Sequence, residues 1–361
     1  MLQTREHLHI CELLQVKRGV VALTKIDLVE PDWLEMVRTD LQGFLAGTFL
    51  EGAPVVAVSS VTGQGLSQLR TILRETAETI EPRCDSGIFR LPIDRVFTIK
   101  GFGTVVTGTL WSGTVRVGGE VVILPVGRRS RVRRLQVHGH TVEQAWAGQR
   151  TAVNLPGLEV DQLNRGDLLA FPDTLQPTLT LDVSLALLKD APRALRNRTR
   201  VRFHLGTGEI LARVVLLDRE ELNPGEEAYA HLRLEGMTVA LAGDRYVIRS
   251  YSPAQTIGGG SILDPNPRSG AGPGRCCSNT SRSCRPVHRP SRSSACCCRP
   301  VRYRSCRMRS GYRPAWMRPR CSESLDNLLR AVRLWRWGPK ANSDICTGKA
   351  MIVWRQRSYL V

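Results

Sequence analysis

The first eighty residues alternate between helical and strand patterns of hydrophobic positions. Apolar side chains recur at helical spacing near the N-terminus, and short continuous apolar runs typical of buried strands follow. The order is helix, strand, helix, strand, helix, which predicts a parallel sheet covered by helices. The five segments are residues 3–16, Val20–Leu23, a helix opened by Pro31 that extends to Leu45, Val55–Val58, and a helix containing Leu66, Leu69 and Leu73.

After Pro82 the pattern changes to short β-rich runs separated by glycine turns. This spacing predicts a small antiparallel barrel, a linker marked by Pro172 and Pro177, and a second β-rich block that ends near Leu263. The predicted fold class is α/β plus all-β, with domains at residues 1–82, 83–173 and 174–267 and a tail at 268–361. The expected strands are Phe89–Phe97, Thr104–Leu110, Gly119–Leu124, Val132–Val137, Thr151–Leu155, Leu168–Ala170, Val201–Leu205, Ile210–Leu217, Ala228–Leu234 and Arg245–Arg249.

Charge and cysteine content separate the tail from the rest of the chain. From Ser269 onward there are 20 basic and 3 acidic side chains, or +17, so only +1 of the total +18 belongs to the body. Nine of the eleven cysteines also lie in the tail, and the body keeps Cys11 and Cys84, a usage that suits a reducing cytosol. With no signal peptide and no run of 18 apolar residues, we expect a cytoplasmic protein without a membrane partner.

Two short motifs follow the two predicted strands of the first domain. Thr24-Lys25-Ile26-Asp27 comes after the first strand, and Ser59-Ser60-Val61-Thr62-Gly63 comes after the second. The carboxyl ends of neighbouring parallel strands meet at one edge of a sheet. There Asp27 can accept hydrogen bonds from guanine N1 and N2, the Lys25 stem can cover the ring, and a backbone N–H of the second loop can reach the guanine oxygen. Taken alone, the first motif is equally compatible with a solvated loop.

Longer strings resemble the selenocysteine-specific branch of the translational GTPases. Gln3-Thr4-Arg5-Glu6-His7-Leu8 and the two loop motifs resemble the second half of a GTPase domain, and threonine at position 24, where most of the superfamily has asparagine, is a feature of that branch. Residues 93–109 resemble the start of the second domain, and residues 147–150, 164–167 and 252–260 agree as well. The resemblance spans residues 1–268.

This resemblance implies a function and a fold. It implies an elongation factor that delivers selenocysteinyl-tRNA to the ribosome at recoded UGA codons, with GTP and Mg²⁺ as ligands in the family. It also implies that the two barrels correspond to elongation-factor domains 2 and 3. The guanine-binding residues carried over are Thr24, Lys25, Asp27, Ser59 and Ser60.

In the family the second domain holds the selenocysteinyl group, and the matching motifs carry this role to Asp94, Arg95 and Arg150. A selenol is largely ionised at neutral pH whereas serine is not, so nearby guanidinium groups favour the selenolate. Asp94 can orient one arginine or accept the aminoacyl amine. The plain alternative is that Asp94 and Arg95 form an ordinary salt bridge within the barrel and that Arg150 is a surface residue.

Before Thr24 we find no Gly-Lys-Ser/Thr phosphate loop, no magnesium-binding threonine and no Asp-x-x-Gly turn. We therefore expect the phosphate and Mg²⁺ ligands to be absent from this chain and its own binding of GTP to be weak. The pattern reads as an N-terminally truncated product or a late start. The strands that should flank Val20–Leu23 would be missing, which predicts an uncovered sheet edge. A non-enzymatic RNA-binding remnant that keeps only the barrels is the second functional hypothesis.

The tail departs from the family, which continues into winged-helix repeats that bind an mRNA hairpin. Residues 269–320 are instead rich in arginine, cysteine, serine and proline, without a Cys-x-x-Cys pair, so we expect no zinc site. The composition indicates a reading-frame change near Arg268, with a basic RNA-binding tail as the alternative. Either way, we expect this segment to be mostly disordered.

Overall fold

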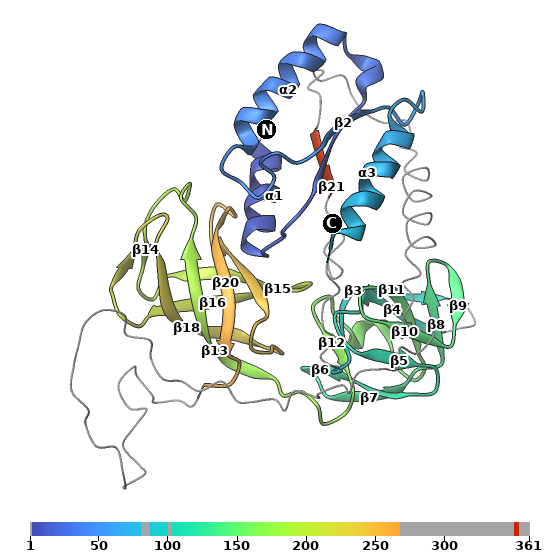
Figure 1. Ribbon diagram of the computed structural model, residues 1–361. Coiled ribbons are helices and arrows are strands. Elements are labelled where there is room, and N and C mark those ends of the chain that lie inside the picture. The colour runs from blue at the N-terminus through green and yellow to red at the C-terminus, as the bar shows by residue number, and fades with distance from the viewer. Residues whose placement is uncertain (1, 81–86, 100–102, 268–349, 354–361) are drawn as a thin grey trace, which may run out of the picture.

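The computed structural model describes residues 2–80, 87–99, 103–267 and 350–353, which form an α/β part and two β-barrels (Figure 1). Among these residues, no helix combines the length and apolarity needed to cross a bilayer. The α/β part confirms the predicted order of elements. It comprises α1 (Leu2–Leu13), β1 (Val20–Thr24), the 3-10 helix η1 (Ile26–Leu28), α2 (Pro31–Leu45), β2 (Val55–Val58) and α3 (Leu66–Glu78).

Strand β1 runs parallel to β2 and is buried on both faces. Alternate residues of a strand face opposite sides. Val21 and Leu23 therefore pack in one cluster with residues of α1 and α2, while Val20 and Ala22 pack in another with residues of β2 and α3. A strand covered on both faces is apolar at every position, which explains why its sequence shows no alternation.

The other edge of β1 carries a strand from far along the chain. Strand β21 (Ala350–Val353) pairs antiparallel with β1, from Val20 opposite Val353 to Leu23 opposite Ala350, and it is the red arrow in Figure 1. The expectation of an uncovered edge was therefore wrong. It considered only the strands that a GTPase domain supplies, whereas an open edge can pair with any extended segment. The rest of the tail, which we expected to be disordered, lies outside the described residues.

Barrel 1 is a rolled antiparallel sheet with the strand order β7-β6-β12-β3-β4-β11-β8-β9. Its inward side chains form one apolar core that includes Phe89, Ile93 and Leu135. The strands are β3 (Arg90–Ile99), β4 (Gly103–Thr109), β6 (Glu120–Leu124), β7 (Arg128–Arg131), β8 (Arg134–Val137), β9 (His140–Val142), β11 (Arg150–Leu155) and β12 (Leu168–Ala170), with a separate pair, β5 (Thr114–Arg116) and β10 (Gln144–Trp146), and the 3-10 helix η2 (Val160–Gln162).

Barrel 2 is closed, with the strand order β13-β18-β16-β15-β19-β20. Its core contains the rings of Phe203 and Tyr246, whose centroids lie 5.3 Å apart. The strands are β13 (Thr178–Leu187), β15 (Arg200–Leu205), β16 (Gly208–Leu216), β18 (Glu227–Thr238), β19 (Arg245–Ser250) and β20 (Thr256–Asp264), with a short outer pair, β14 (Leu195–Arg196) and β17 (Glu221–Leu222).

A polar contact joins the α/β part to barrel 2. Glu6 of α1 accepts hydrogen bonds from the Arg249 guanidinium (2.8 Å) and the Thr256 hydroxyl (2.9 Å). Burial alone would raise the pKa of Glu6, but the Thr256 hydrogen bonds and the Arg249 charge outweigh it and hold the pKa below its usual value. Glu6 belongs to the Gln3–Leu8 string, so this string contributes to docking of the domain as well as to the family signature.

Candidate functional site

The two predicted guanine-binding loops lie side by side. The parallel register places Thr24 opposite Val58, so the chain leaves β1 and β2 at the same sheet edge, as the sequence predicted. Lys25 adopts a left-handed conformation with φ 64°, which turns the chain from β1 into η1. Such a conformation is disfavoured for a residue other than glycine, and residues held in it cluster at functional sites. Lys25 and Asp27 are both exposed to solvent.

The second loop is held in a closed turn by Ser59. Its hydroxyl is buried and accepts hydrogen bonds from the backbone N–H groups of Val61 and Thr62, each at 3.2 Å. Gly65 ends the loop with φ 74°, and a Cβ at this position would lie 2.0 Å from the Ala57 carbonyl oxygen, so only glycine fits here. Ser59 is thus a loop-shaping residue in this structure, while its neighbour Ser60 is exposed.

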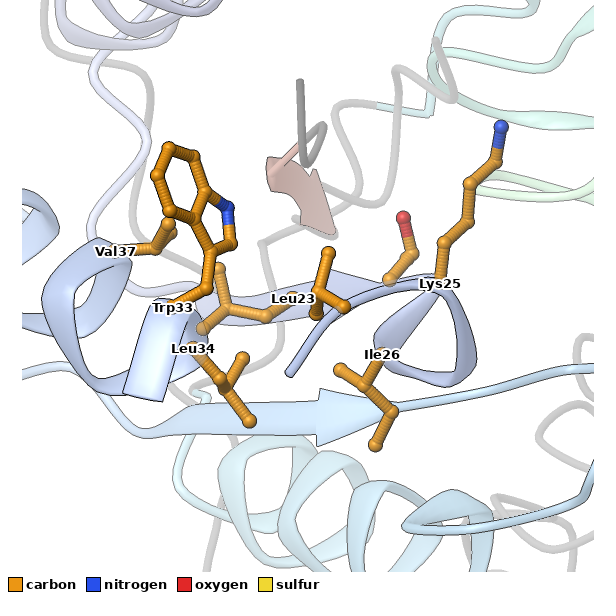
Figure 2. A pocket seen from close by; sticks show the side chains of 8 residues that line it. Leu23, Lys25, Ile26, Trp33, Leu34 and Val37 are labelled. Atoms are coloured by element: carbon orange, nitrogen blue, oxygen red, sulfur yellow. The ribbon is translucent and has the colours of Figure 1, made fainter. Parts of the chain in front are cut away.

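A small hollow lies beside the first loop but does not join the two motifs. Figure 2 shows Trp33, Leu34 and Val37 of α2 around Leu23, with the Lys25 side chain pointing away from them. The hollow has a volume of about 20 Å³, which is room for one water molecule and not for a base. Asp27, Ser59 and Ser60 are not among its lining residues. The predicted guanine site is therefore an open edge between two loops, distinct from this hollow.

The second candidate site lies on the outer face of barrel 1, where β3 carries a bulge. Between Ile93 and Arg95 the pairing with β4 shifts by one residue, so Asp94 is the extra residue. Ile93 and Val96 both contact the core, and the two residues between them lie on the outside. A bulge re-aims side chains in this way, and bulges are frequent next to functional sites.

The Asp94 carboxylate binds two partners from neighbouring strands. Arg150, the first residue of β11, donates from Nη1 to Oδ2 at 2.5 Å and from Nη2 to Oδ1 at 3.2 Å. The Thr107 hydroxyl of β4 donates to Oδ1 at 2.7 Å. This two-point geometry fixes the guanidinium plane, as is typical of arginine and carboxylate pairs. The structure thus brings Asp94 and Arg150 together, as the sequence grouped them.

Arg95 remains outside this pair. It is exposed, and within the described part of the chain it forms no salt bridge. The alternative of an Asp94–Arg95 salt bridge is therefore wrong, because the register of three strands places Arg150 against Asp94. Thr107 was not identified from the sequence as a partner of Asp94. The one indication would have been its outward position on β4, and this position cannot be aligned with Asp94 until the bulge is known.

Comparisons with known proteins agree with this architecture. Residues 1–79 match the elongation factor Tu GTP binding domain, and residues 103–170 match elongation factor Tu domain 2. Residues 180–269 match the beta-barrel domain of selenocysteine-specific elongation factor. These matches, in the order of the α/β part and the two barrels, define the class as a translation elongation factor.

Individual relatives narrow the class to one family. The chain is 54% identical to a selenocysteine-specific elongation factor of Desulfomicrobium baculatum over 265 residues, 73% of this chain and 42% of that protein. It is 33% identical to the factor of Escherichia coli over 74% of this chain and 41% of that protein. The chain belongs to the selenocysteine-specific elongation factor family, and it spans about two fifths of the length of these bacterial relatives.

Solved structures give the same result. A bacterial selenocysteine-specific elongation factor superposes with a TM-score of 0.64 at 29% identity, covering 72% of this chain and 42% of that one. The apo form of elongation factor SelB from Methanococcus maripaludis gives 0.65 at 28% identity, covering 73% of this chain and 62% of that one. The predicted fold class, a partial GTPase domain followed by two barrels, is confirmed.

Proposed function

We propose that this chain forms part of a factor that delivers selenocysteinyl-tRNA to the ribosome at recoded UGA codons in a GTP-dependent way. The observation that carries the proposal is the Asp94, Thr107 and Arg150 cluster with Arg95 beside it, on the barrel that matches elongation-factor domain 2. The family match favours this function over the alternative of an RNA-binding remnant. An mRNA hairpin partner belongs to the same proposal, although its winged-helix reader is not recognisable in this sequence.

The two arginines have different roles in the proposed aminoacyl site. Both Nη atoms of Arg150 donate to Asp94, so the carboxylate compensates much of the Arg150 charge. The pair therefore forms a fixed side of the proposed aminoacyl site. Arg95 has no carboxylate partner in the described structure and is the guanidinium free to meet a selenolate. A seryl hydroxyl carries no charge and gains little from it. The site therefore discriminates by charge at one atom of the aminoacyl group.

The guanine-binding role of the two loops supports the GTP part of the proposal. Thr24, Lys25 and Asp27 leave the sheet next to Ser59 and Ser60, which is the arrangement that a guanine base requires. Translation elongation factor SelB of Methanococcus maripaludis, in complex with the GTP analogue GPPNHP, superposes with a TM-score of 0.61 at 27% identity, covering 73% of this chain and 63% of that one. Mg²⁺ would accompany the phosphates, for which we recognise no ligands in this sequence.

The test compares selenocysteinyl-tRNA with the same tRNA carrying serine. A charge-assisted contact contributes about 1.5–3 kcal/mol, and the exposure of Arg95 places the expected preference near the lower limit, about tenfold. Arg95→Ala should abolish the preference, and Arg150→Ala should weaken it by releasing Asp94. Because both ligands share one tRNA body, non-specific contacts of the arginine-rich tail cancel in the ratio.

Arg193→Ala provides the matched control, since Arg193 is an exposed arginine of barrel 2 without a salt bridge in the described structure. It should leave the preference unchanged. Circular dichroism of each variant checks that the barrels stay folded. Equal affinity of the parent chain for the two tRNAs would refute the proposed aminoacyl site and leave these residues with a structural role alone.

A further inference from the structure

A cavity lies between the two barrels, separate from both sites described above. It has a volume of about 140 Å³ and is lined by residues of barrel 1 and of barrel 2. The guanine loops and the aminoacyl residues Asp94, Arg95 and Arg150 are not among its lining residues. Because an apolar cavity of about 150 Å³ can hold one benzene molecule, this one has room for an apolar side chain of similar size.

Part of the cavity wall is apolar. Trp111 comes from barrel 1, and Phe203, Leu205 and Ile210 come from the hairpin of β15 and β16 in barrel 2. Phe203 and Leu205 belong to the core of barrel 2, and Trp111 and Ile210 pack against that core. An apolar group that enters this space is removed from water, which is favourable. This part of the wall therefore selects a ligand with an apolar portion.

The polar part of the wall includes a buried carboxylate with an unused acceptor atom. Asp167 is only 7% exposed, and its Oδ2 accepts a hydrogen bond from the backbone N–H of Asn164 at 2.8 Å. No described residue donates to its Oδ1. Burial raises the pKa of Asp167 above its usual value, and the Asn164 hydrogen bond opposes this shift only in part. Such a carboxylate gains from a cationic hydrogen-bond donor.

The same wall contains a cation without a carboxylate partner. Arg165 is exposed and forms no salt bridge with any described residue. Only Gly166 separates it from Asp167, so the Cα atoms of the two charged residues lie within about 7 Å of each other. Glu209, the other carboxylate of the wall, is compensated by Arg202. The cavity therefore offers one negative and one positive group close together, both available to a ligand.

We propose that this cavity binds a free α-amino acid with an apolar side chain. The ammonium and the carboxylate of an α-amino acid are attached to the same carbon, which matches an acceptor and a donor that start two residues apart. The ammonium donates to Asp167 Oδ1, and the Arg165 guanidinium donates to the carboxylate. The side chain contacts Trp111, Phe203 and Ile210.

The charges of the wall favour a zwitterion over simpler ligands. A monoanion would place its charge near Asp167 without compensating it, and a monocation would do the same near Arg165. The aminoacyl group of a tRNA does not fit either, because its carboxyl group is esterified and carries no charge for Arg165. This inference therefore goes beyond the proposed function and does not depend on it.

The first experiment measures ligand binding to the full chain by saturation-transfer NMR, which observes the methyl signals of L-leucine. We expect a dissociation constant of about 1 mM or lower, as is typical of ligands with so few atoms. Two matched analogues each lack one charge: 4-methylpentanoate has no ammonium, and 3-methylbutylamine has no carboxylate. Each should bind about tenfold more weakly, since each loses one charge-assisted hydrogen bond. Absence of L-leucine binding, or equal binding of the three molecules, would overturn the proposal.

D-leucine tests whether the side chain is held together with the two charges. It has the same charge and size as L-leucine, so non-specific association with the arginine-rich tail treats the two alike. A site that contacts ammonium, carboxylate and side chain distinguishes mirror images. D-leucine should bind about fivefold more weakly, because one of the three contacts is lost. Equal affinity for the two enantiomers would contradict the assigned contacts.

Two variants assign the binding to this cavity. Arg165→Gln removes an exposed cation and should weaken L-leucine about tenfold while leaving the weaker binding of 3-methylbutylamine unchanged. Met237→Trp enlarges a lining residue that is 54% exposed, so it should obstruct the cavity without disturbing either core. Arg193→Gln, the matched control on barrel 2, should keep full binding, and circular dichroism checks the fold of each variant. L-leucine binding that survives both cavity variants would place the ligand elsewhere and refute the site.

The cavity and the aminoacyl site fail independently. Arg165→Gln should keep the preference for selenocysteinyl-tRNA over seryl-tRNA, and Arg95→Ala should keep the affinity for L-leucine. If the preference is present and L-leucine does not bind, the cavity proposal is refuted and the aminoacyl site stands. If L-leucine binds and the preference is absent, the reverse holds. Loss of L-leucine binding in Arg95→Ala would place the amino acid in the aminoacyl site and overturn the cavity proposal.

Discussion

The His204 imidazole lies on the outer face of barrel 2 among several cationic groups. Its Nε2 atom is buried and has no hydrogen-bond partner in the described structure. Burial lowers its pKa below 6.5, Glu209 partly opposes this shift, and Arg249, Arg202 and Arg165 reinforce it. The folded protein therefore holds this histidine neutral at pH values where a free histidine begins to take up a proton.

The stability of barrel 2 should depend on this histidine below pH 6.5. In the unfolded chain His204 takes up a proton in this pH range, whereas burial in the folded barrel opposes its protonation. The contribution of neutral His204 to the free energy of unfolding is therefore fully present above pH 6.5 and is lost as the pH falls through the pKa of the folded state. His204→Gln should flatten this loss. Hydrogen exchange of barrel 2 peptides at pH 7.5 and 5.5, corrected for intrinsic rates, measures the effect. Identical pH profiles for the parent chain and the variant would contradict the prediction.

The Asp94 cluster shows which part of a site a sequence can supply. The family strings named Asp94, Arg95 and Arg150, and the structure pairs Asp94 with Arg150, but this pairing could not be read from the sequence. Adjacent residues on a regular strand face opposite sides, and the bulge removes this rule. The arginine partner of Asp94 is 56 residues away because β3, β4 and β11 are in one particular register.

At the scale of elements, β20 contains three consecutive glycines inside a buried strand. Glycine in a strand is normally unfavourable, yet here a Cβ would meet a neighbouring backbone oxygen at each position. The distance would be 2.4 Å at Gly258, 2.4 Å at Gly259 and 1.9 Å from the Ser184 oxygen at Gly260. Strand β20 closes barrel 2 between β13 and β19. The glycines therefore allow the backbones of both neighbouring strands to approach β20 closely.

Gly260→Ala should destabilise barrel 2 by about 3 kcal/mol, because overpacking against backbone cannot be relieved by a rotamer change. The matched control is Gly236→Ala in β18, where the nearest atom would be a side-chain carbon of Ile210 at 3.6 Å, an ordinary contact. Its effect should stay below about 1 kcal/mol. Urea unfolding of both variants, followed by the circular dichroism of the strands, makes the comparison. Equal midpoints would contradict the close-approach explanation.

The elements that the sequence predicted share an apolar pattern. Several of those it missed lack one, although β13, which alternates regularly through Leu181, Val183 and Leu185, was also not singled out. The helices and strands of the α/β part and most strands with buried alternation were predicted within a few residues. Strand β7 was missed because its sequence, Arg-Arg-Ser-Arg, carries no inward apolar residue. Strand β20 was not recognised within the second β-rich block because its three glycines interrupt the apolar pattern. Strand β21 lies in a tail whose composition predicted no structure. In each case tertiary pairing, not local propensity, forms the strand.

At the scale of the whole molecule, the two barrels are joined by an almost buried ion pair. Arg90 at the start of β3 donates to both carboxylate oxygens of Asp244 in barrel 2, at 3.0 and 2.7 Å. Their side chains are only 12% and 11% exposed. The Arg90 guanidinium also lies 5.3 Å from the Trp111 ring, and Trp111 packs against the core of barrel 2. These contacts fix the orientation of one barrel against the other.

Asp244→Ala should therefore release this orientation while both cores remain intact. Removing one partner leaves a buried, uncompensated guanidinium, at a cost of about 3–5 kcal/mol to the contact between the barrels. The double variant Arg90→Met, Asp244→Leu should recover much of the loss, because an apolar pair does not leave a charge buried. Small-angle scattering should show a larger radius of gyration for Asp244→Ala than for the parent chain and the double variant.

The matched control is Glu235→Ala, which breaks the two-point contact of Arg200 with Glu235 within barrel 2. Both side chains of that pair are 37% exposed, so solvent screens their interaction and the orientation of the barrels should not change. The different scattering of the two variants would then follow from the burial of the Arg90–Asp244 pair, because both pairs have two-point hydrogen-bond geometry. If Asp244→Ala scatters like Glu235→Ala, apolar packing around Trp111 is sufficient to hold the barrels, and the ion pair has no orienting role.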